Sequence, residues 1–326
     1  KATTDQNDFA PHAWRRIGAK SPSCARYFRF LIGVVSDSMN SHDTRIIRDS
    51  KVLSSMTRSA IAEGKTVGLV PTMGYLHEGH ASLIRAARAK CDFVVVSDFV
   101  NPTQFGPTED YATYPRDEAA DLALCAACGA DVLFIPDVAM LYPNGQDSTW
   151  VEVSRLGTIL CGASRPGHFR GVATVVTKLL MISRADYAFF GEKDYQQLTI
   201  LRRMVADLGS PCEIIGMPIV READGLALSS RNVRLTPASR IEALALHRGL
   251  EMARDSYLAG ERSVQKLIAT AQSEIDLQPD AKIDYISIAD ADTLDISTDD
   301  AGSRPLMLMA VRFGSVRLID NMKLFA

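Results

Sequence analysis

The sequence lacks any apolar run long enough to cross a membrane. One run, Phe30 to Val35, is far shorter than the roughly 20 residues of a spanning helix, and no small-residue cleavage pattern of a signal peptide accompanies it. The sequence also lacks a strong charge of either sign, since 36 basic and 39 acidic residues give a formal net charge of −3. We therefore expect neither a membrane nor a nucleic acid as a partner.

Cysteine is scarce and scattered. The six cysteines stand at positions 24, 91, 125, 128, 161 and 212, a distribution that fits reduced thiols in a cytoplasmic protein. Cys125 and Cys128 form a C-x-x-C pair, which occurs in redox and zinc sites. Flanking leucines and alanines favour two small apolar residues on one helix face instead, and no second pair has the spacing of a zinc site.

No P-loop, no internal repeat and no Ser-His-Asp or Cys-His arrangement is recognisable. The sequence instead alternates apolar strands with helices, and this repeated order predicts an α/β fold with a doubly wound parallel sheet. Strands are expected at 66–70, 93–97, 132–135, 187–190 and 214–217, and helices at 49–63, from the histidine motif described below to about 90, and at 115–128, 171–183 and 194–208.

Three segments are predicted along the chain. Residues 1–44 mix Pro, Ser, Arg and Asn without periodicity, so we expect a disordered or weakly ordered extension, with Met39 as a candidate native start. Residues 45–219 contain the parallel sheet, and residues 220–326 are predicted to form a smaller α+β domain. The expected elements of this smaller domain are helices at 236–257 and 263–275 and strands at 283–288, 306–311 and 316–319.

The most informative motif is His77-Glu78-Gly79-His80, which follows an apolar strand and precedes a helix. A turn of this kind, at the carboxyl end of a parallel strand and the start of a helix, is where α/β sheets bind phosphates. Both imidazoles fall on one face of the first helical turn, and the glycine lets a ligand approach the backbone. Either histidine alone fits a helix cap or a partly buried ring. Together they favour nucleotide chemistry, as hydrogen-bond donors to phosphate oxygens.

Two further loops carry groups that suit phosphates. Gly191-Glu192-Lys193-Asp194 follows the strand 187–190. Lys193 is either a partner for a polyphosphate or a solvated surface charge, and Asp194 either binds a ribose hydroxyl or caps the next helix. Leu228-Ser229-Ser230-Arg231 joins two hydroxyls to a guanidinium, which makes either a phosphate cradle or an exposed Ser/Arg loop.

Polar groups for a second, smaller ligand follow two other elements. Gln104 comes shortly after the strand 93–97 and offers both a donor and an acceptor, unless it faces solvent in a turn. Arg165 to Val172 is a polar junction before a helix, and it is either part of a site or an ordinary helix N-terminus with basic surface residues.

Together these segments resemble the pantothenate synthetase (pantoate–β-alanine ligase) family of the nucleotidyltransferase superfamily with an H-x-G-H signature. The resemblance covers about residues 45–323. Its motifs are P-T-M-G-Y-L-H-E-G-H at 71–80, N-P-T-Q-F at 101–105, Y-P-R at 114–116, R-P-G-H-F-R-G-V at 165–172, F-G-E-K-D-Y-Q-Q at 190–197 and G-L-A-L-S-S-R-N at 225–232. Leu228 replaces a common Met at similar volume. Cys161 stands where related enzymes often carry Glu, so a polar contact near the site is expected to be absent.

The resemblance implies a Rossmann-like sheet and a two-step reaction. The pantoate carboxylate attacks the α-phosphate of ATP to give pantoyl adenylate and pyrophosphate, and the amine of β-alanine then displaces AMP to give pantothenate. His80 is implied as the proton donor, with His77, Lys193 and Arg231 as further catalytic residues. The implied ATP-binding residues are Met73, Gly74, His77, Gly79, His80, Gly191, Glu192, Lys193, Asp194, Val220, Leu228, Ser229, Ser230 and Arg231.

The resemblance also implies the remaining partners. Gln104 and Gln197 would bind pantoate, together with Pro71 and Thr72, and Gln104 would also lie near β-alanine. Mg²⁺ is expected with the phosphates of ATP, held mainly by phosphate oxygens and water, with Asp121 as a candidate to steady it. Related enzymes are homodimers, so we expect one here.

Three other functions use similar features. A cytidylyl- or adenylyltransferase would share the sheet and the histidine pair, but Gln104 and Gln197 suit a short hydroxy acid better than a second nucleotide. A class I aminoacyl-tRNA synthetase is disfavoured by the small second domain and the absence of a basic surface signal. A non-enzymatic ATP-binding module would need no pocket for a second substrate.

Overall fold

The computed structural model describes residues 43–107, 109–146 and 149–326. The prediction of an N-terminal extension, up to residue 42, and of Met39 as a start lies outside these residues. Among the described helices, none combines the length and the apolarity that a membrane crossing requires.

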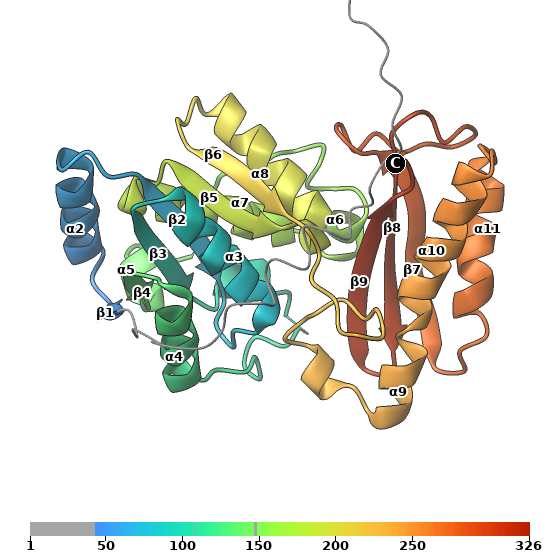
Figure 1. The fold of residues 1–326 in the computed structure, drawn as a ribbon, viewed down its shortest axis with the longest axis horizontal. Coiled ribbons are helices and arrows are strands. Elements are labelled where there is room, and N and C mark those ends of the chain that lie inside the picture. Colours follow the sequence, from blue (N-terminus) through green and yellow to red (C-terminus); the bar gives the residue numbers. More distant parts are fainter. Residues whose placement is uncertain (1–42, 108, 147–148) are drawn as a thin grey trace, which may run out of the picture. The chain divides into compact units, whose positions relative to one another are not determined.

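A six-stranded parallel sheet forms the larger part of the described fold (Figure 1). Its strand order is β1-β4-β3-β2-β5-β6, which confirms the predicted doubly wound α/β fold. The three-residue strand β1 was not predicted, because so short a segment has no detectable periodicity. The strands are β1 (Arg45–Ile47), β2 (Val67–Thr72), β3 (Phe93–Asp98), β4 (Val132–Phe134), β5 (Tyr187–Gly191) and β6 (Glu213–Met217).

Helices cover both faces of this sheet, which explains why its strands are almost continuously apolar. One apolar cluster packs α2, α7 and α8 against one face, and another packs α3 and α4 against the opposite face. The helices are α2 (Ser50–Ala62), α3 (Glu78–Lys90), α4 (Glu118–Cys128), α5 (Val138–Leu141), α6 (Cys161–Ser164), α7 (His168–Ser183) and α8 (Tyr195–Asp207).

Two helix starts differ from the prediction for local reasons. Helix α4 begins at Glu118 rather than at residue 115, because the Asp117 side chain accepts a hydrogen bond from the Ala120 N–H and caps the helix there. Helix α7 begins at His168 rather than at residue 171, because Gly167 adopts φ +83° and turns the chain into the helix.

Strand β2 lies at the point where the direction of strand addition reverses. Its neighbour on one side is β3, the next strand in the chain, and its neighbour on the other side is β5, which follows β4 by a long connection. Open α/β sheets bind ligands beyond the carboxyl ends of strands at such a reversal. The carboxyl ends of β2 and β5 lead into the segments that begin at Met73 and Glu192.

The C-terminal part is a three-stranded antiparallel sheet with helices on one face, as predicted for an α+β unit. Alternate residues of β8 face the helices, while Leu306 and Leu308 pack against Leu156 and Tyr195 of the N-terminal part. A separate folding unit at 220–326 stays a prediction. The elements are α9 (Pro237–Glu242), α10 (Ala245–Leu258), α11 (Val264–Ile275), β7 (Ala281–Asp290), β8 (Pro305–Phe313) and β9 (Val316–Lys323).

Candidate active site

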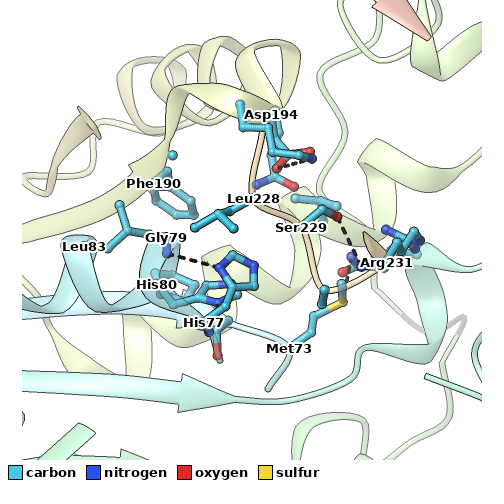
Figure 2. A pocket seen from close by; sticks show the side chains of 18 of the residues that line it. Met73, His77, Gly79, His80, Leu83, Phe190, Asp194, Leu228, Ser229 and Arg231 are labelled. Carbon is cyan, nitrogen blue, oxygen red and sulfur yellow. Dashed lines mark hydrogen bonds and ion pairs between the residues drawn. The ribbon is translucent and has the colours of Figure 1, made fainter. Parts of the chain in front are cut away.

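A cavity of about 230 Å³ lies beyond the carboxyl ends of β2 and β5. Residues from the separate predicted loops line this one cavity. In Figure 2 the two histidines lie near Leu228, and Ser229 and Arg231 lie farther along the cavity. The site residues predicted from the sequence that line this cavity are Pro71, Thr72, Met73, His77, Gly79, His80, Gln104, Gly191, Lys193, Asp194, Gln197, Val220, Leu228, Ser229, Ser230 and Arg231. The expectation that separate loops meet at one sheet edge therefore agrees with the geometry.

The two histidines bond to the backbone in a reciprocal pattern at the start of α3. His77 is the residue that caps the helix, and its Nδ1 accepts from the Gly79 N–H at 3.1 Å. His80 Nδ1 accepts from the His77 N–H at 3.2 Å. Because Nδ1 is an acceptor in both rings, a neutral imidazole carries its proton on Nε2. Each ring therefore retains one N–H donor.

Both imidazoles are neutral at physiological pH. Burial and the charge of Lys193 lower the pKa of His77 to about 4. Burial, the neighbouring His77 and Lys193 lower the pKa of His80 to about 3. The ring centroids are 4.1 Å apart, so two positive charges there would repel strongly. The pair therefore offers hydrogen-bond donors rather than positive charges to the cavity.

Gly79 is required by this arrangement. A Cβ added at this position would lie 2.9 Å from His77 Cε1 and 3.0 Å from His77 Nδ1. Any side chain would push the His77 ring out of its capping position. The glycine of the motif thus makes room for the imidazole as well as for a ligand.

Lys193 and Asp194 enter the cavity from the 3-10 turn Glu192–Asp194, which follows β5 directly. The Lys193 ammonium lies 3.9 Å from an Asp194 carboxylate oxygen. Asp194 makes no side-chain bond to the start of α8, so the alternative that it only caps this helix is not realised. Lys193 is mostly buried at the cavity wall, with 20% of its side chain exposed, rather than a solvated surface charge.

Leu228 to Arg231 forms a second wall and is tied to a segment far away in the sequence. Ser230 Oγ and the Tyr114 hydroxyl are 3.0 Å apart. Arg231 donates to Asp110 at 3.2 and 3.3 Å, and Arg234 also pairs with Asp110. Tyr114 and its neighbours were noted as a motif in the sequence, but no role was predicted for Tyr114 or Asp110.

Gln104 is buried beside an apolar part of the cavity, and its amide has a defined orientation. Its Oε1 accepts from Asn101 Nδ2 at 3.0 Å, while Asn101 Oδ1 accepts from the Tyr142 hydroxyl at 2.8 Å. The Gln104 NH₂ group is thereby directed toward Met73 Sδ, 3.3 Å away, at the cavity wall. Gln104 is therefore a donor to any ligand at this position. The apolar lining nearby consists of Phe99, Val172, Val175, Val176 and Leu179.

Arg165 and His168 also line the cavity, and sequence reasoning left their role open. His168 Nδ1 donates to the Gln104 carbonyl at 2.8 Å, and its Nε2 accepts from Arg165 at 3.0 Å. Burial and the Arg165 charge lower the pKa of His168 to about 4. Arg165 is paired with Glu109 at 2.6 Å. This network binds the backbone carbonyl of Gln104, while Asn101 binds its side chain.

Three predicted site residues do not line the cavity. Gly74 adopts φ +76° and packs against the Asp98 carboxyl, where a Cβ would collide. The Glu192 carboxylate turns away and pairs with Lys323 at 3.1 Å. Asp121 is 1% exposed, and its two oxygens accept from the Tyr75 and Leu76 N–H groups at 2.7 and 2.6 Å. These three residues shape the turns that lead into the site.

Asp121 therefore does not fit the role of a metal ligand. Both of its oxygens bond to the backbone, and burial together with the Asp121 charge raises the pKa of neighbouring Asp98 to about 6. Within the described residues, no group of three His, Cys, Asp or Glu side chains is placed to hold a metal ion.

Cys161 also lies outside the cavity lining. The expectation that it lacks a polar contact is not met. Its sulfur is 3.1 Å from the Tyr285 hydroxyl and accepts from Arg317 at 3.6 and 3.7 Å. Cys125 and Cys128 are buried as free thiols in the cluster beneath α3 and α4, in agreement with the structural interpretation of this pair.

Comparisons with known proteins identify the family. A family profile described as Pantoate-beta-alanine ligase matches residues 45–323. The pantothenate synthetase of Moorella thermoacetica is 55% identical over 266 residues, which cover 82% of this chain and 93% of that protein. The pantothenate synthetase of Geobacter sulfurreducens is 52% identical over 277 residues, which cover 85% and 97%.

Solved structures give the same result. A pantothenate synthetase from Thermus thermophilus has a TM-score of 0.82 at 45% identity, over 87% of this chain and all of that chain. A pantoate–β-alanine ligase from Francisella tularensis, complexed with beta-gamma ATP and β-alanine, has a TM-score of 0.72 at 36% identity, over 86% and 98%. The chain therefore belongs to the pantoate–β-alanine ligase family.

Proposed function

We propose that this ligase joins pantoate to β-alanine in two steps within the cavity at the ends of β2 and β5. In the first step, a carboxylate oxygen of pantoate bonds to the α-phosphorus of ATP and pyrophosphate leaves. In the second step, the amine of β-alanine bonds to the activated carbonyl carbon, AMP leaves, and the amine loses a proton. The carrying observation is that phosphate-type donors and a small apolar, amide-lined pocket share one cavity.

The donor-rich part of the cavity suits the nucleotide. Lys193 and Arg231 supply positive charge, and the N–H groups of neutral His77 and His80 supply donors that keep their protonation state across physiological pH. Preorganised donors of this kind stabilise the charge that builds on phosphate oxygens in the transition state. We assign His80 the largest part of this stabilisation, because it is the more deeply buried of the two rings. The backbone of Gly79 and the side chains of Met73, Val220 and Leu228 complete the nucleotide wall.

The opposite part of the cavity suits pantoate. Gln104 and Gln197 offer amide groups for its carboxylate and hydroxyl oxygens, and Pro71 and Thr72 also line the cavity. Phe99, Val175, Val176 and Leu179 provide an apolar surface for its two methyl groups. Most of the rate acceleration then comes from aligning the carboxylate with the α-phosphate. Direct amide formation would fail because the carboxylate lacks a good leaving group.

Three further features of the proposal rest on the family rather than on the geometry. Mg²⁺ enters with ATP, held by phosphate oxygens and water, since the described residues offer no cage for it. As in related enzymes, the active form proposed here is a homodimer in the cytoplasm.

The decisive experiment is exchange of labelled pyrophosphate into ATP, with and without pantoate. We expect exchange only when pantoate is present, and pantothenate and AMP in equal amounts when β-alanine is added. Exchange that does not need pantoate, or that requires a nucleotide acceptor, would favour another nucleotidyltransferase. ATP binding without any exchange would favour a binding module.

A further inference from the structure

Two neighbouring residues of β9, Asp320 and Asn321, contact both of the loops that face the nucleotide. They are 3% and 5% exposed, although each carries a polar side chain. Neither residue lines the main cavity. Both border a smaller adjoining cavity that Lys193 also lines, which places them directly behind the nucleotide site.

Asn321 is bonded to the turn that carries Lys193. Its Nδ2 donates to the carbonyl oxygens of Glu192 and Lys193, both at 2.9 Å. Because one amide nitrogen carries two N–H bonds, it can hold both carbonyls at once and restrict the backbone on either side of the Lys193 Cα. The lysine side chain starts from this restrained point and enters the cavity.

Asp320 is bonded to the other nucleotide-facing loop through Arg221. The two guanidinium nitrogens of Arg221 donate to the two Asp320 oxygens at 2.6 and 2.9 Å, a bidentate pair with defined geometry. Arg221 also donates to the Gly225 carbonyl at 3.1 Å and pairs with Ala227 across a short hairpin. That hairpin continues directly into Leu228 and the segment that ends at Arg231.

The bonds within β9 make these two contacts one unit. Asp320 Oδ1 accepts from the Asn321 backbone N–H at 2.8 Å. A shift of either loop is therefore opposed by the same strand. We propose that Asp320 and Asn321 are positioning residues for adenylation, and that this strand of the C-terminal sheet sets the distance between Lys193 and Arg231 across the phosphates. This inference rests on the proposed function of the cavity.

If β9 served only to attach the C-terminal sheet, substitutions in its different links to the Lys193 turn would have similar effects. Lys323, on the same strand, also reaches the Lys193 turn, because its ammonium pairs with the Glu192 carboxylate at 3.1 Å. This pair is partly exposed, with 38% and 24% of the two side chains accessible. It joins two side chains and does not hold the backbone carbonyls of the Lys193 turn, as Asn321 does.

The test compares Asn321→Ala with the matched control Lys323→Ala in pantoate-dependent ATP–pyrophosphate exchange. Asn321→Ala is expected to lower kcat about 10- to 100-fold, the order of effect of a small misplacement of a catalytic group. ATP affinity, measured by equilibrium dialysis, is expected to change much less, because a misplaced Lys193 still attracts the phosphates. Lys323→Ala is expected to stay within about 2-fold of the unmodified enzyme in kcat.

Two further variants keep the inference testable. Asn321→Ser retains one donor in place of two, so its kcat should lie between those of Asn321→Ala and the unmodified enzyme. It also replaces Asn321→Ala should that variant not fold. Arg221→Lys keeps the charge but loses the bidentate geometry, and a several-fold lower kcat is expected.

Equal kcat values for folded Asn321 variants and Lys323→Ala would overturn the role of Asn321. An unchanged kcat in Arg221→Lys would overturn the role of Asp320. Failure of the proposed function itself would appear separately, as an absence of pantoate-dependent exchange in the unmodified enzyme.

Discussion

The two walls of the cavity are built in different ways. The histidine wall and the Lys193 turn follow β2 and β5, which are paired neighbours in the sheet, so strand pairing brings them together. Asn321 adds a side-chain restraint on the Lys193 turn. The Ser229–Arg231 wall follows the last strand of the sheet and is held by side chains, through Tyr114, Asp110 and the Arg221–Asp320 pair. The histidine wall therefore depends mainly on the backbone topology, and the Ser229–Arg231 wall depends on individual hydrogen bonds and ion pairs.

This difference predicts how each wall should respond to substitution. In the histidine wall, a change in a lining side chain removes a chemical group but leaves the loop in place, because buried strands set the position of the loop. In the second wall, a change loosens the geometry but leaves the chemical groups in place. Losses of rate should therefore be large and specific in the first wall, and moderate in the second.

The largest effect is expected for His80→Ala. The substitution removes a buried, neutral N–H donor, and pantoate-dependent exchange should fall by about 10²-fold or more. The matched control is Glu78→Ala in the same motif, because the Glu78 carboxylate forms an exposed ion pair with Arg85 and does not line the cavity. Near-normal turnover in His80→Ala would contradict the assigned role, provided that the thermal midpoints of the variants agree.

The next effect concerns stability rather than rate. His168 has a pKa of about 4 in the folded protein against 6.5 for an ordinary histidine, so the unfolded chain binds more protons between these values. The contribution of His168 to the free energy of unfolding is therefore fully present above pH 6.5 and is lost as the pH falls toward 4. One such group changes the free energy of unfolding by up to about 1.4 kcal/mol per pH unit.

His168→Gln tests this assignment, because an amide donates and accepts without titrating. Urea unfolding at pH 7.5, 6 and 5 should show a shallower loss of stability in the variant than in the unmodified protein. Carboxylates contribute equally to both proteins, so their effect cancels in the comparison. The same pH slope in both would mean that burial and the Arg165 charge do not hold His168 neutral.

A moderate effect is expected for Tyr114→Phe in the second wall. It removes the hydroxyl that bonds to Ser230, a contact of about 0.5–1.5 kcal/mol in typical cases. We expect KM for ATP to rise about 2- to 10-fold while kcat changes little. Tyr111→Phe is the control, because the Tyr111 ring contacts Phe105 edge-on and its substitution keeps that contact. Equal KM values for the two variants would mean that the Tyr114 hydroxyl does not support ATP binding.

The same contrast explains what could be predicted from the sequence. The order of strands and helices and the place of His77 and His80 follow from hydrophobic periodicity and from glycines at turns, which are local signals. The partners of Arg231 are not local, since Asp110 lies 121 residues earlier. No periodic pattern records such a contact.

Gly74, Glu192 and Asp121 were predicted as site residues but do not line the cavity, for a related reason. A motif indicates that a turn is present but not which of its side chains points inward. Glu192 points toward Lys323, and Asp121 bonds to the backbone of the turn before His77. Tyr75 in that turn has φ +53°, so the two bonds from Asp121 stabilise a conformation that a tyrosine rarely adopts. Asp121 thus supports the first wall without facing a ligand.

The smallest effect is expected for deletion of residues 1–38. The family match begins at residue 45, and the residues that line the cavity lie between 71 and 231. Both walls, and the strand β9 that supports them, are therefore retained in the shortened chain. Its kcat and KM values for ATP and pantoate should equal those of the full chain within about 2-fold. A large loss of activity in a shortened protein with an unchanged thermal midpoint would mean that the first 38 residues contribute to catalysis, and that the site is not complete within the two walls.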